Sequence, residues 1–353
     1  MANAYYTCNL LPLGLLTRNG YAARWLGNAV GQTQAPLRRE ALSVHPMTCP
    51  FVTRLVAAGD LLLSEAPPED RVVVPGGCDA MRRAGDLLSA TYPGRVFVLP
   101  MPRANDRSAV ERMAGDLGRL DAWLARGVDQ LTDGGSADPA TRAAETQGGS
   151  TDAAAPTGSA SAQSPQVEYP SLPENGGVFV VAGPLSDDSL LRLVEDLGAT
   201  VAGLESCTSP DRWRPLAQLG AESGANLDLA TGAELDFFAL AEQLLTVGMC
   251  PRRSSIPRRE HLARRLDETK PASIIYARQS FCDPGSYDAL IVAELAEERG
   301  LPFLDVEVGF PFESSGPLRT RVEAFLEAQL LDDDLLDDDL FGAPCDDDVC
   351  GEG

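Results

Sequence analysis

The apolar residues of this chain come in short valine-rich runs that alternate with longer segments of helical period. From Arg71 onward the pattern predicts a strand over 71–77, a helix over 78–92, a strand over 95–102 and a helix over 106–128. Runs that are apolar on both faces are typical of a parallel sheet covered by helices on both sides. The first part of the chain is therefore predicted to be an α/β unit.

The second part of the chain repeats this alternation. Its pattern predicts strands over 177–184, 200–207, 272–282 and 302–310, and helices over 187–199, 232–248, 258–270, 286–300 and 316–331. We therefore expect an α/β fold of two Rossmann-like, doubly wound parallel-sheet domains. The natural place for a site is the cleft between them.

Composition divides the chain into four parts. The α/β domains are predicted over 1–131 and 178–330. Residues 132–177 are rich in Gly, Ser, Ala, Thr and Pro and have almost no large apolar residue to bury, so we expect a flexible linker there. Residues 331–353 form an acidic tail, which we expect to be disordered and solvated.

Charge and hydropathy exclude some classes of function. The net charge of −23 disfavours a role that depends on attraction to nucleic-acid phosphates. Nine aspartates lie in the acidic tail, so the folded body is less acidic than the total implies. No uninterrupted apolar stretch approaches a membrane span, and the first residues lack the pattern of a secretory signal. We therefore expect a cytoplasmic protein with no membrane or nucleic-acid partner.

Three of the eight cysteines share one local context. Cys49 precedes Pro50 and an apolar-periodic helix, Cys78 opens a helix after a Gly-Gly turn, and Cys282 follows a strand and precedes a helix-start signal. A helix N-terminus favours the thiolate form of cysteine, and thiolates are the ligands of iron–sulfur clusters. The chain has no C-x-x-C pair, which argues against a zinc ribbon or a ferredoxin-type run. We interpret the three cysteines as a site for an iron–sulfur cluster with ligands from distant segments.

Spacing alone leaves alternatives open. Any one of these cysteines considered singly is better explained as a small buried hydrophobe. Cys207 also lies at a predicted strand end and is the best rival ligand, while Cys250 follows a helix and Cys8 lies in the first segment. Cys345 and Cys350 belong to the acidic tail, and we interpret both as incidental thiols.

Other candidate chemistry is sparse. His45 has no visible partner, and His261 lies in an arginine-rich helix, where we expect it on the solvated surface. A basic run, Arg252, Arg253, Arg258 and Arg259, could contact phosphates, but an exposed helix face is the favoured interpretation. The chain has no Walker-type loop and no G-x-G-x-x-G, so we do not expect it to bind ATP itself.

Several motifs resemble one family. TCPFVTRLV with Cys49, VVVPGGCDAMRRAGDLL with Cys78, IIYARQSFCD with Cys282 and a late TRVEAFLE are similar to segments of the 2-hydroxyacyl-CoA dehydratase and benzoyl-CoA reductase family, of the 2-hydroxyglutaryl-CoA dehydratase D-component type. The resemblance implies a [4Fe–4S] cluster held between two Rossmann-like domains by Cys49, Cys78 and Cys282, with one iron left open. Two features depart from the family: Pro12 is followed by Leu13 and Gly14 where many members have acidic residues, and the linker replaces a long helical region.

The resemblance also implies an activity and partners. Family dehydratases deliver one electron to the thioester carbonyl of an acyl-CoA, which gives a ketyl radical that expels the neighbouring hydroxyl. The chain is thus expected to be the cluster-bearing subunit of such an enzyme, paired with a related second subunit or a second copy. Its electrons are expected from an ATP-dependent activator that carries its own cluster. The alternatives are a small-molecule reductase of the double-cubane type and a non-catalytic, cluster-bearing electron-transfer or accessory protein.

Overall fold

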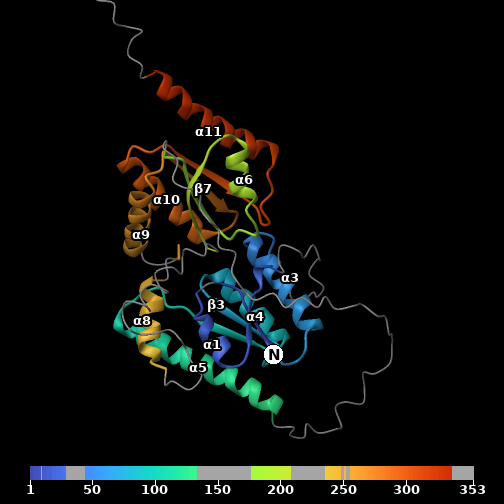
Figure 1. The fold of residues 1–353 in the computed structure, drawn as a ribbon. Coiled ribbons are helices and arrows are strands. Elements are labelled where there is room, and N and C mark those ends of the chain that lie inside the picture. The colour runs from blue at the N-terminus through green and yellow to red at the C-terminus, as the bar shows by residue number, and fades with distance from the viewer. Residues whose placement is uncertain are drawn as a thin grey trace, which may run out of the picture.

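The computed structural model describes residues 1–8, 10–28, 44–132, 176–207, 235–247, 250–251 and 255–335. The described chain contains two four-stranded, all-parallel sheets flanked by helices, one in each half (Figure 1). The predicted α/β class with two Rossmann-like domains is therefore confirmed. The predicted linker lies almost entirely outside the described residues, as does most of the predicted tail. The domain limits stay predictions.

The two sheets have the same strand order. The first sheet contains β1 (Asn3–Tyr6), β2 (Ala22–Trp25), β3 (Arg71–Gly76) and β4 (Val96–Pro100), in the order β2-β1-β3-β4. The second contains β5 (Val178–Ala182), β6 (Val201–Ser206), β7 (Ser273–Gln279) and β8 (Phe303–Val308), in the order β6-β5-β7-β8. In each sheet the winding direction reverses between the two central strands. This topological switch opens a crevice at the carboxyl ends of those strands.

Helices cover both faces of each sheet. The first domain contains α1 (Leu13–Arg18), α3 (Pro50–Glu65), α4 (Asp79–Thr91) and α5 (Arg107–Thr132), and the second contains α6 (Ser189–Asp196), α9 (Ser255–Thr269), α10 (Asp283–Glu298) and α11 (Gly316–Leu335). Alternate strand residues serve opposite cores, as the two-residue period of a strand requires. Val72 and Val74 pack with α3 and α4, whereas Val73 packs with α1 and α5. This burial on both faces explains the continuous apolar runs in the sequence.

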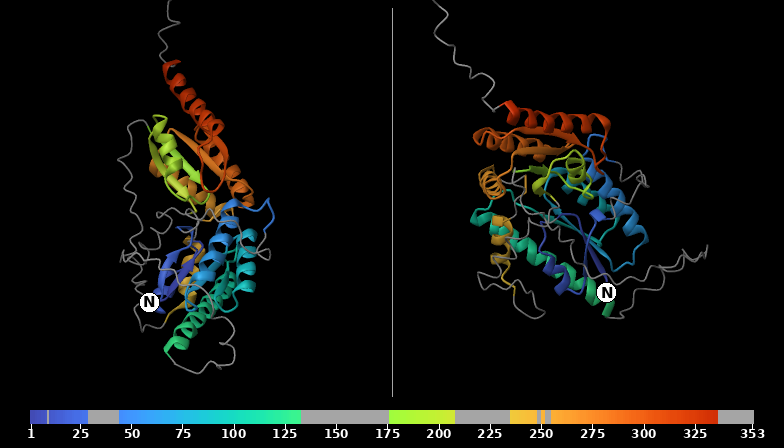
Figure 2. Two further views of the ribbon diagram at one scale, coloured as in Figure 1. Left: turned by 90° about the vertical axis from the view of Figure 1, so that its right-hand side faces the viewer. Right: turned by 45° about the horizontal axis from the view of Figure 1, so that its top comes forward.

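One helix of the second half packs on the first domain. Helix α8 (Phe237–Val247) lies beside α5, and its Leu240 and Leu244 belong to the same buried cluster as Leu117 and Leu120 of α5 (Figure 1). The chain therefore returns to the first sheet before α9 begins. Figure 2 shows the two α/β bodies stacked on one another, with α11 along the outside of the second.

The ends of the described chain add two observations. Helix α11 continues to Leu335, which lies within the acidic segment predicted as tail. None of the described helices combines the length and the apolar character that crossing a membrane requires.

Candidate functional site

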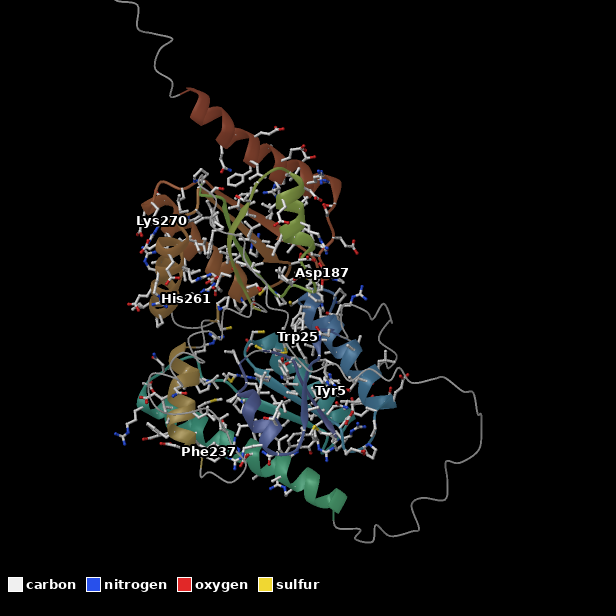
Figure 3. All side chains as sticks on the ribbon, in the orientation of Figure 1. Tyr5, Trp25, Asp187, Phe237, His261 and Lys270 are labelled. Atoms are coloured by element: carbon white, nitrogen blue, oxygen red, sulfur yellow. The ribbon has the colours of Figure 1, made fainter. Side chains whose placement is uncertain are left out.

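A cavity lies where the carboxyl ends of the two sheets meet. Its wall includes the residues that follow four strands, Thr7 after β1, Gly77 after β3, Gly183 after β5 and Cys207 after β6, together with the last residue of β7, Gln279. Open α/β sheets place their ligand sites at this edge. The lining residues surround about 870 Å³ of empty space, a figure that includes space open to solvent. Trp25, at the end of β2, lies in its wall near the junction of the two domains (Figure 3).

Cysteine is the chemically distinctive side chain of this wall. The three predicted ligands, Cys49, Cys78 and Cys282, line the same cavity. The three rival cysteines line it as well: Cys8, Cys207 and Cys250. None of the six forms a disulfide with another described cysteine, and all are buried or half-buried. Each domain contributes to the set. Cys345 and Cys350 lie outside the described residues.

Each of the three predicted cysteines is the N-cap residue of a helix. Cys49 precedes α3, with proline next to it in the first turn, Cys78 precedes α4, and Cys282 precedes α10. The thiol of Cys78 accepts a hydrogen bond from the backbone N–H of Met81 at 3.5 Å. The backbone N–H of Gly285, in the first turn of α10, acts on the thiol of Cys282 to lower its pKa, against the larger effect of burial. The predicted helix starts are confirmed, and each start directs free N–H groups toward sulfur.

Burial favours the protonated form of two of these thiols, Cys49 and Cys282. It raises the pKa of Cys49, and the neighbouring thiol of Cys78 raises it further. Burial also raises the pKa of Cys282, and the adjacent thiols of Cys49, Cys207 and Cys78 add to the effect. Raised pKa values are the opposite of what an activated nucleophilic cysteine needs. Cys49 and Cys282 are therefore poor candidates for nucleophilic catalysis.

The described wall of the cavity has no charged side chain that could stabilise a thiolate. Among the described residues that line the cavity there is no Arg, Lys, His, Asp or Glu, and the polar side chains other than cysteine are Thr7, Tyr276 and Gln279. Thiolates buried here must be balanced by a positive charge that the described wall does not supply. A bound metal would supply that charge and would deprotonate the thiols as it binds.

The arrangement of the thiols indicates what kind of metal group they suit. In the described part of the chain no three His, Cys, Asp or Glu side chains come close enough together to hold a single metal ion. The thiols nevertheless surround one cavity from both domains. A donor set of thiols alone, spread around a space larger than one ion, fits an iron–sulfur cluster, which several thiolates bind at separate iron atoms.

A buried ionic network lies directly behind the wall. The guanidinium of Arg258, in α9, donates to Asp288 of α10 and to Glu205 of β6, with Nη1 to Glu205 Oε1 at 2.8 Å. His261 lies 3.1 Å from the other oxygen of Glu205. Tyr276 donates from the wall to Asp288 at 3.2 Å. The network connects β6, α9, α10 and β7. Of these elements, β6 ends directly before Cys207, and α10 begins directly after Cys282.

This network corrects two predictions. Arg258 and His261 were expected on an exposed helix face, but Arg258 is 1% exposed and His261 is 6% exposed. Their side of α9 packs on the second sheet, and Glu205 and Asp288 compensate the buried charge. Burial would lower the pKa of Arg258, but the two carboxylates outweigh it and hold that pKa well above its usual value. The sequence signal was Glu205, an acidic residue inside an apolar strand. Arg252 and Arg253 lie outside the described residues.

Phenylalanine residues lie beside two of the predicted ligands, Cys49 and Cys282. The rings of Phe51 and Phe310 meet edge to face with their centroids 5.0 Å apart, and they join the two domains beside Cys49. Phe281, directly before Cys282, has a φ of 55°. A bulky residue in this left-handed region costs about 1–2 kcal/mol, and such strain is concentrated at functional sites.

Comparison with known proteins gives a family match for part of the chain. Residues 162–328 match the family model described as 2-hydroxyglutaryl-CoA dehydratase, D-component. A protein of Escherichia coli (strain K12) named "Putative dehydratase subunit YjiM" is 23% identical over 141 residues. Those residues are 40% of this chain and 33% of that protein, so the match spans about a third of the relative's length. The family resemblance drawn from the motifs is confirmed.

Proposed function

We propose that this chain, which the match over residues 162–328 assigns to the 2-hydroxyglutaryl-CoA dehydratase D-component family, is the iron–sulfur subunit of a dehydratase-type enzyme. The observation that carries the proposal is the set of thiols at the facing carboxyl ends of two parallel sheets. The proposed ligands of a [4Fe–4S] cluster are Cys49, Cys78 and Cys282. When bound, such a cluster supplies single electrons to a substrate held beside it.

The three helix N-termini support this choice of ligands. Each places backbone N–H groups beside a sulfur that becomes a thiolate on binding metal, and hydrogen bonds of this kind stabilise the added negative charge. The apolar surroundings, including Trp25 and Phe51, limit the access of water and lower the local dielectric constant. The proposed substrate is an acyl-CoA thioester, and the proposed partners are a related subunit and an ATP-dependent activator.

One observation favours a second candidate. Cys8, Cys207 and Cys250 line the same cavity as the three proposed ligands, and a single [4Fe–4S] cluster with three protein ligands leaves these thiols without a role. Cys207 lies close enough to Cys282 to raise the pKa of the Cys282 thiol. Six thiols suit a larger cluster of the double-cubane type, and the function would then be reduction of a small molecule.

Anaerobic reconstitution with iron and sulfide tests the proposal and separates the two candidates. With three ligands, wild-type protein binds about four iron atoms per chain. Alanine at Cys49, Cys78 or Cys282 then abolishes the cluster, while alanine at Cys8, Cys207 or Cys250 leaves the iron content unchanged. With six ligands, wild-type protein binds roughly twice as much iron, and both sets of variants lose it.

A matched control and an activity assay complete the experiment. Cys345→Ala removes a thiol outside the described site and should retain the wild-type iron content. A wild-type protein that takes up no cluster under anaerobic conditions contradicts the whole proposal. With a loaded protein, conversion of a 2-hydroxyacyl-CoA in the presence of an activator and ATP identifies a dehydratase. A loaded protein that accepts electrons but converts no thioester is instead a reductase or an electron-transfer partner.

A further inference from the structure

The surface that the cavity presents to a ligand is almost entirely apolar. Large apolar side chains reach it from three elements of the first domain: Trp25 from β2, Phe51 and Val52 from α3, and Met81 from α4. Trp25 is half-buried and lies near the junction of the two domains (Figure 3). A surface of this kind binds apolar groups, because water leaves both partners when they meet.

The polar side chains of the wall other than cysteine belong to the fold. The hydroxyl of Tyr276 donates to Asp288 at 3.2 Å, and Nε2 of Gln279 donates to the carbonyl oxygen of Val308 at 2.9 Å. Both hydrogen bonds lead away from the cavity, to partners that do not line it. The Oγ1 of Thr7 is fully shielded and has no hydrogen-bond partner among the described residues. These groups therefore add little polar character to the cavity surface.

A cation lies behind this wall, but it is already paired. The guanidinium of Arg258 contacts the carboxylates of Asp288 and Glu205, each at 2.8 Å, and none of the three lines the cavity. A carboxylate that entered the cavity would leave water without gaining a cationic partner from the described wall. Burial of a charge in that way is costly.

We propose that the acyl group that enters this cavity is uncharged and apolar, with an aliphatic or aromatic side chain, and that Trp25 contacts that side chain. The inference rests on the proposed function, because it takes the substrate to be a 2-hydroxyacyl-CoA thioester. It goes beyond that function by excluding a dicarboxylic acyl group. The description of the matching family names 2-hydroxyglutaryl-CoA, whose acyl group ends in a carboxylate.

The position of the Trp25 ring depends on Gly27. A Cβ atom at Gly27 would overlap the six-membered ring of Trp25, so only glycine lets the ring lie against the backbone there. Gly27→Ala must therefore displace the ring. This gives a second variant that disturbs the contact without removing the aromatic side chain.

A matched pair of thioesters tests the proposal. 2-Hydroxypentanoyl-CoA and 2-hydroxyglutaryl-CoA have acyl chains of the same length and differ in a terminal methyl group against a terminal carboxylate. In calorimetric titration of the anaerobically reconstituted protein, the pentanoyl thioester should bind roughly 100-fold more tightly. Equal affinities, or tighter binding of the glutaryl thioester, would overturn the inference.

Variants test the role of Trp25. Trp25→Ala should weaken binding of the pentanoyl thioester about tenfold and change binding of the glutaryl thioester little, because it removes apolar contact area. Gly27→Ala should act in the same direction. Tyr287→Ala, which removes a 72% exposed ring outside the cavity wall, is the matched control and should change neither affinity. An equal loss for both thioesters in Trp25→Ala would contradict the proposed contact.

Iron analysis of the same samples separates this inference from the proposed function. A loaded protein that prefers the glutaryl thioester contradicts the inference alone. A loaded protein that binds neither thioester contradicts both the acyl-CoA substrate and the inference. A protein that takes up no cluster but prefers the pentanoyl thioester supports the inference and contradicts the cluster.

Discussion

Arg258 and Asp288 form a buried, two-point ion pair between α9 and α10, with Nε to Oδ1 at 2.8 Å and Nη2 to Oδ2 at 2.9 Å. A planar guanidinium matches a carboxylate in this fork geometry, which a lysine cannot reproduce. The third contact, to Glu205, reaches the end of β6 two residues before Cys207. The ion cluster thus holds the strand end and the helix start that present Cys207 and Cys282 to the cavity.

Removing this guanidinium should be costly. Arg258→Met leaves Asp288 and Glu205 buried without a cation, and we expect a loss of about 3–5 kcal/mol in the free energy of unfolding. Urea denaturation of the cluster-free protein measures this loss. The matched control is Arg83→Met, since Arg83 pairs with Asp86 on an exposed helix surface, and its loss should stay within about 0.5 kcal/mol. Equal effects of the two variants would contradict the structural role of Arg258.

The cluster-free protein should lose stability in alkaline solution. Burial raises the pKa of Cys49, Cys282 and Tyr276 in the folded state. In the unfolded chain cysteine releases its proton near pH 8.5 and tyrosine near pH 10, so above these values the folded state binds more protons than the unfolded state. The contribution of these groups is complete below about pH 8 and declines as the pH rises further.

The urea midpoint between pH 7 and 10.5 measures this decline. Cys282→Ser removes one of the titrating groups and should show a shallower decline than wild type. A midpoint that stays constant up to pH 10.5 would mean that these thiols titrate in the folded protein as they do in the unfolded chain.

Two glycines in helices should respond to alanine with opposite signs. A Cβ atom at Gly85 in α4 would lie 2.6 Å from Cγ2 of Val98, whereas a Cβ atom at Gly115 in α5 would meet no atom of the described residues within 4 Å. Gly115→Ala should therefore stabilise the protein by about 0.5–1 kcal/mol, the usual gain in a helix interior.

Gly85→Ala should instead destabilise the protein by about 1–3 kcal/mol, because it overpacks the contact between α4 and β4. Thermal unfolding of the two variants side by side gives both signs. Stabilisation by alanine at both positions would show that α4 can move away from the sheet, and with it the helix start at Cys78.

The edge-to-face pair between Phe51 and Phe310 should protect Cys49. Phe310 is buried, and Phe310→Ala removes the ring that the second domain places over the start of α3. We expect a loss of about 3–5 kcal/mol in stability and faster alkylation of Cys49 by iodoacetamide, which mass spectrometry measures at each cysteine. Tyr287→Ala, at a 72% exposed position, is the control and should change neither quantity. An unchanged alkylation rate in Phe310→Ala would place the protection of Cys49 elsewhere.

Several elements were predictable because their signals are local. Strands β3 and β5 are valine-rich and buried along their whole length. The helices that follow Cys49, Cys78 and Cys282 begin with residues that favour a helix start. Strands β1 and β2 were not predicted, since each is only four residues long and is partly exposed. Such short segments take their strand conformation from pairing with β3 and with each other.

The sequence by itself determined the α/β alternation, the helix starts at three cysteines and the family resemblance, because each depends on neighbouring residues. Only the tertiary structure decided that Cys8, Cys207 and Cys250 share a cavity with those three, that Arg258 and His261 are buried, and that the Thr7 hydroxyl lacks a partner among the described residues. These facts depend on contacts between segments far apart in the chain. Hydrophobic period specifies which face of an element is buried, but not which charged or polar group of another element meets it there.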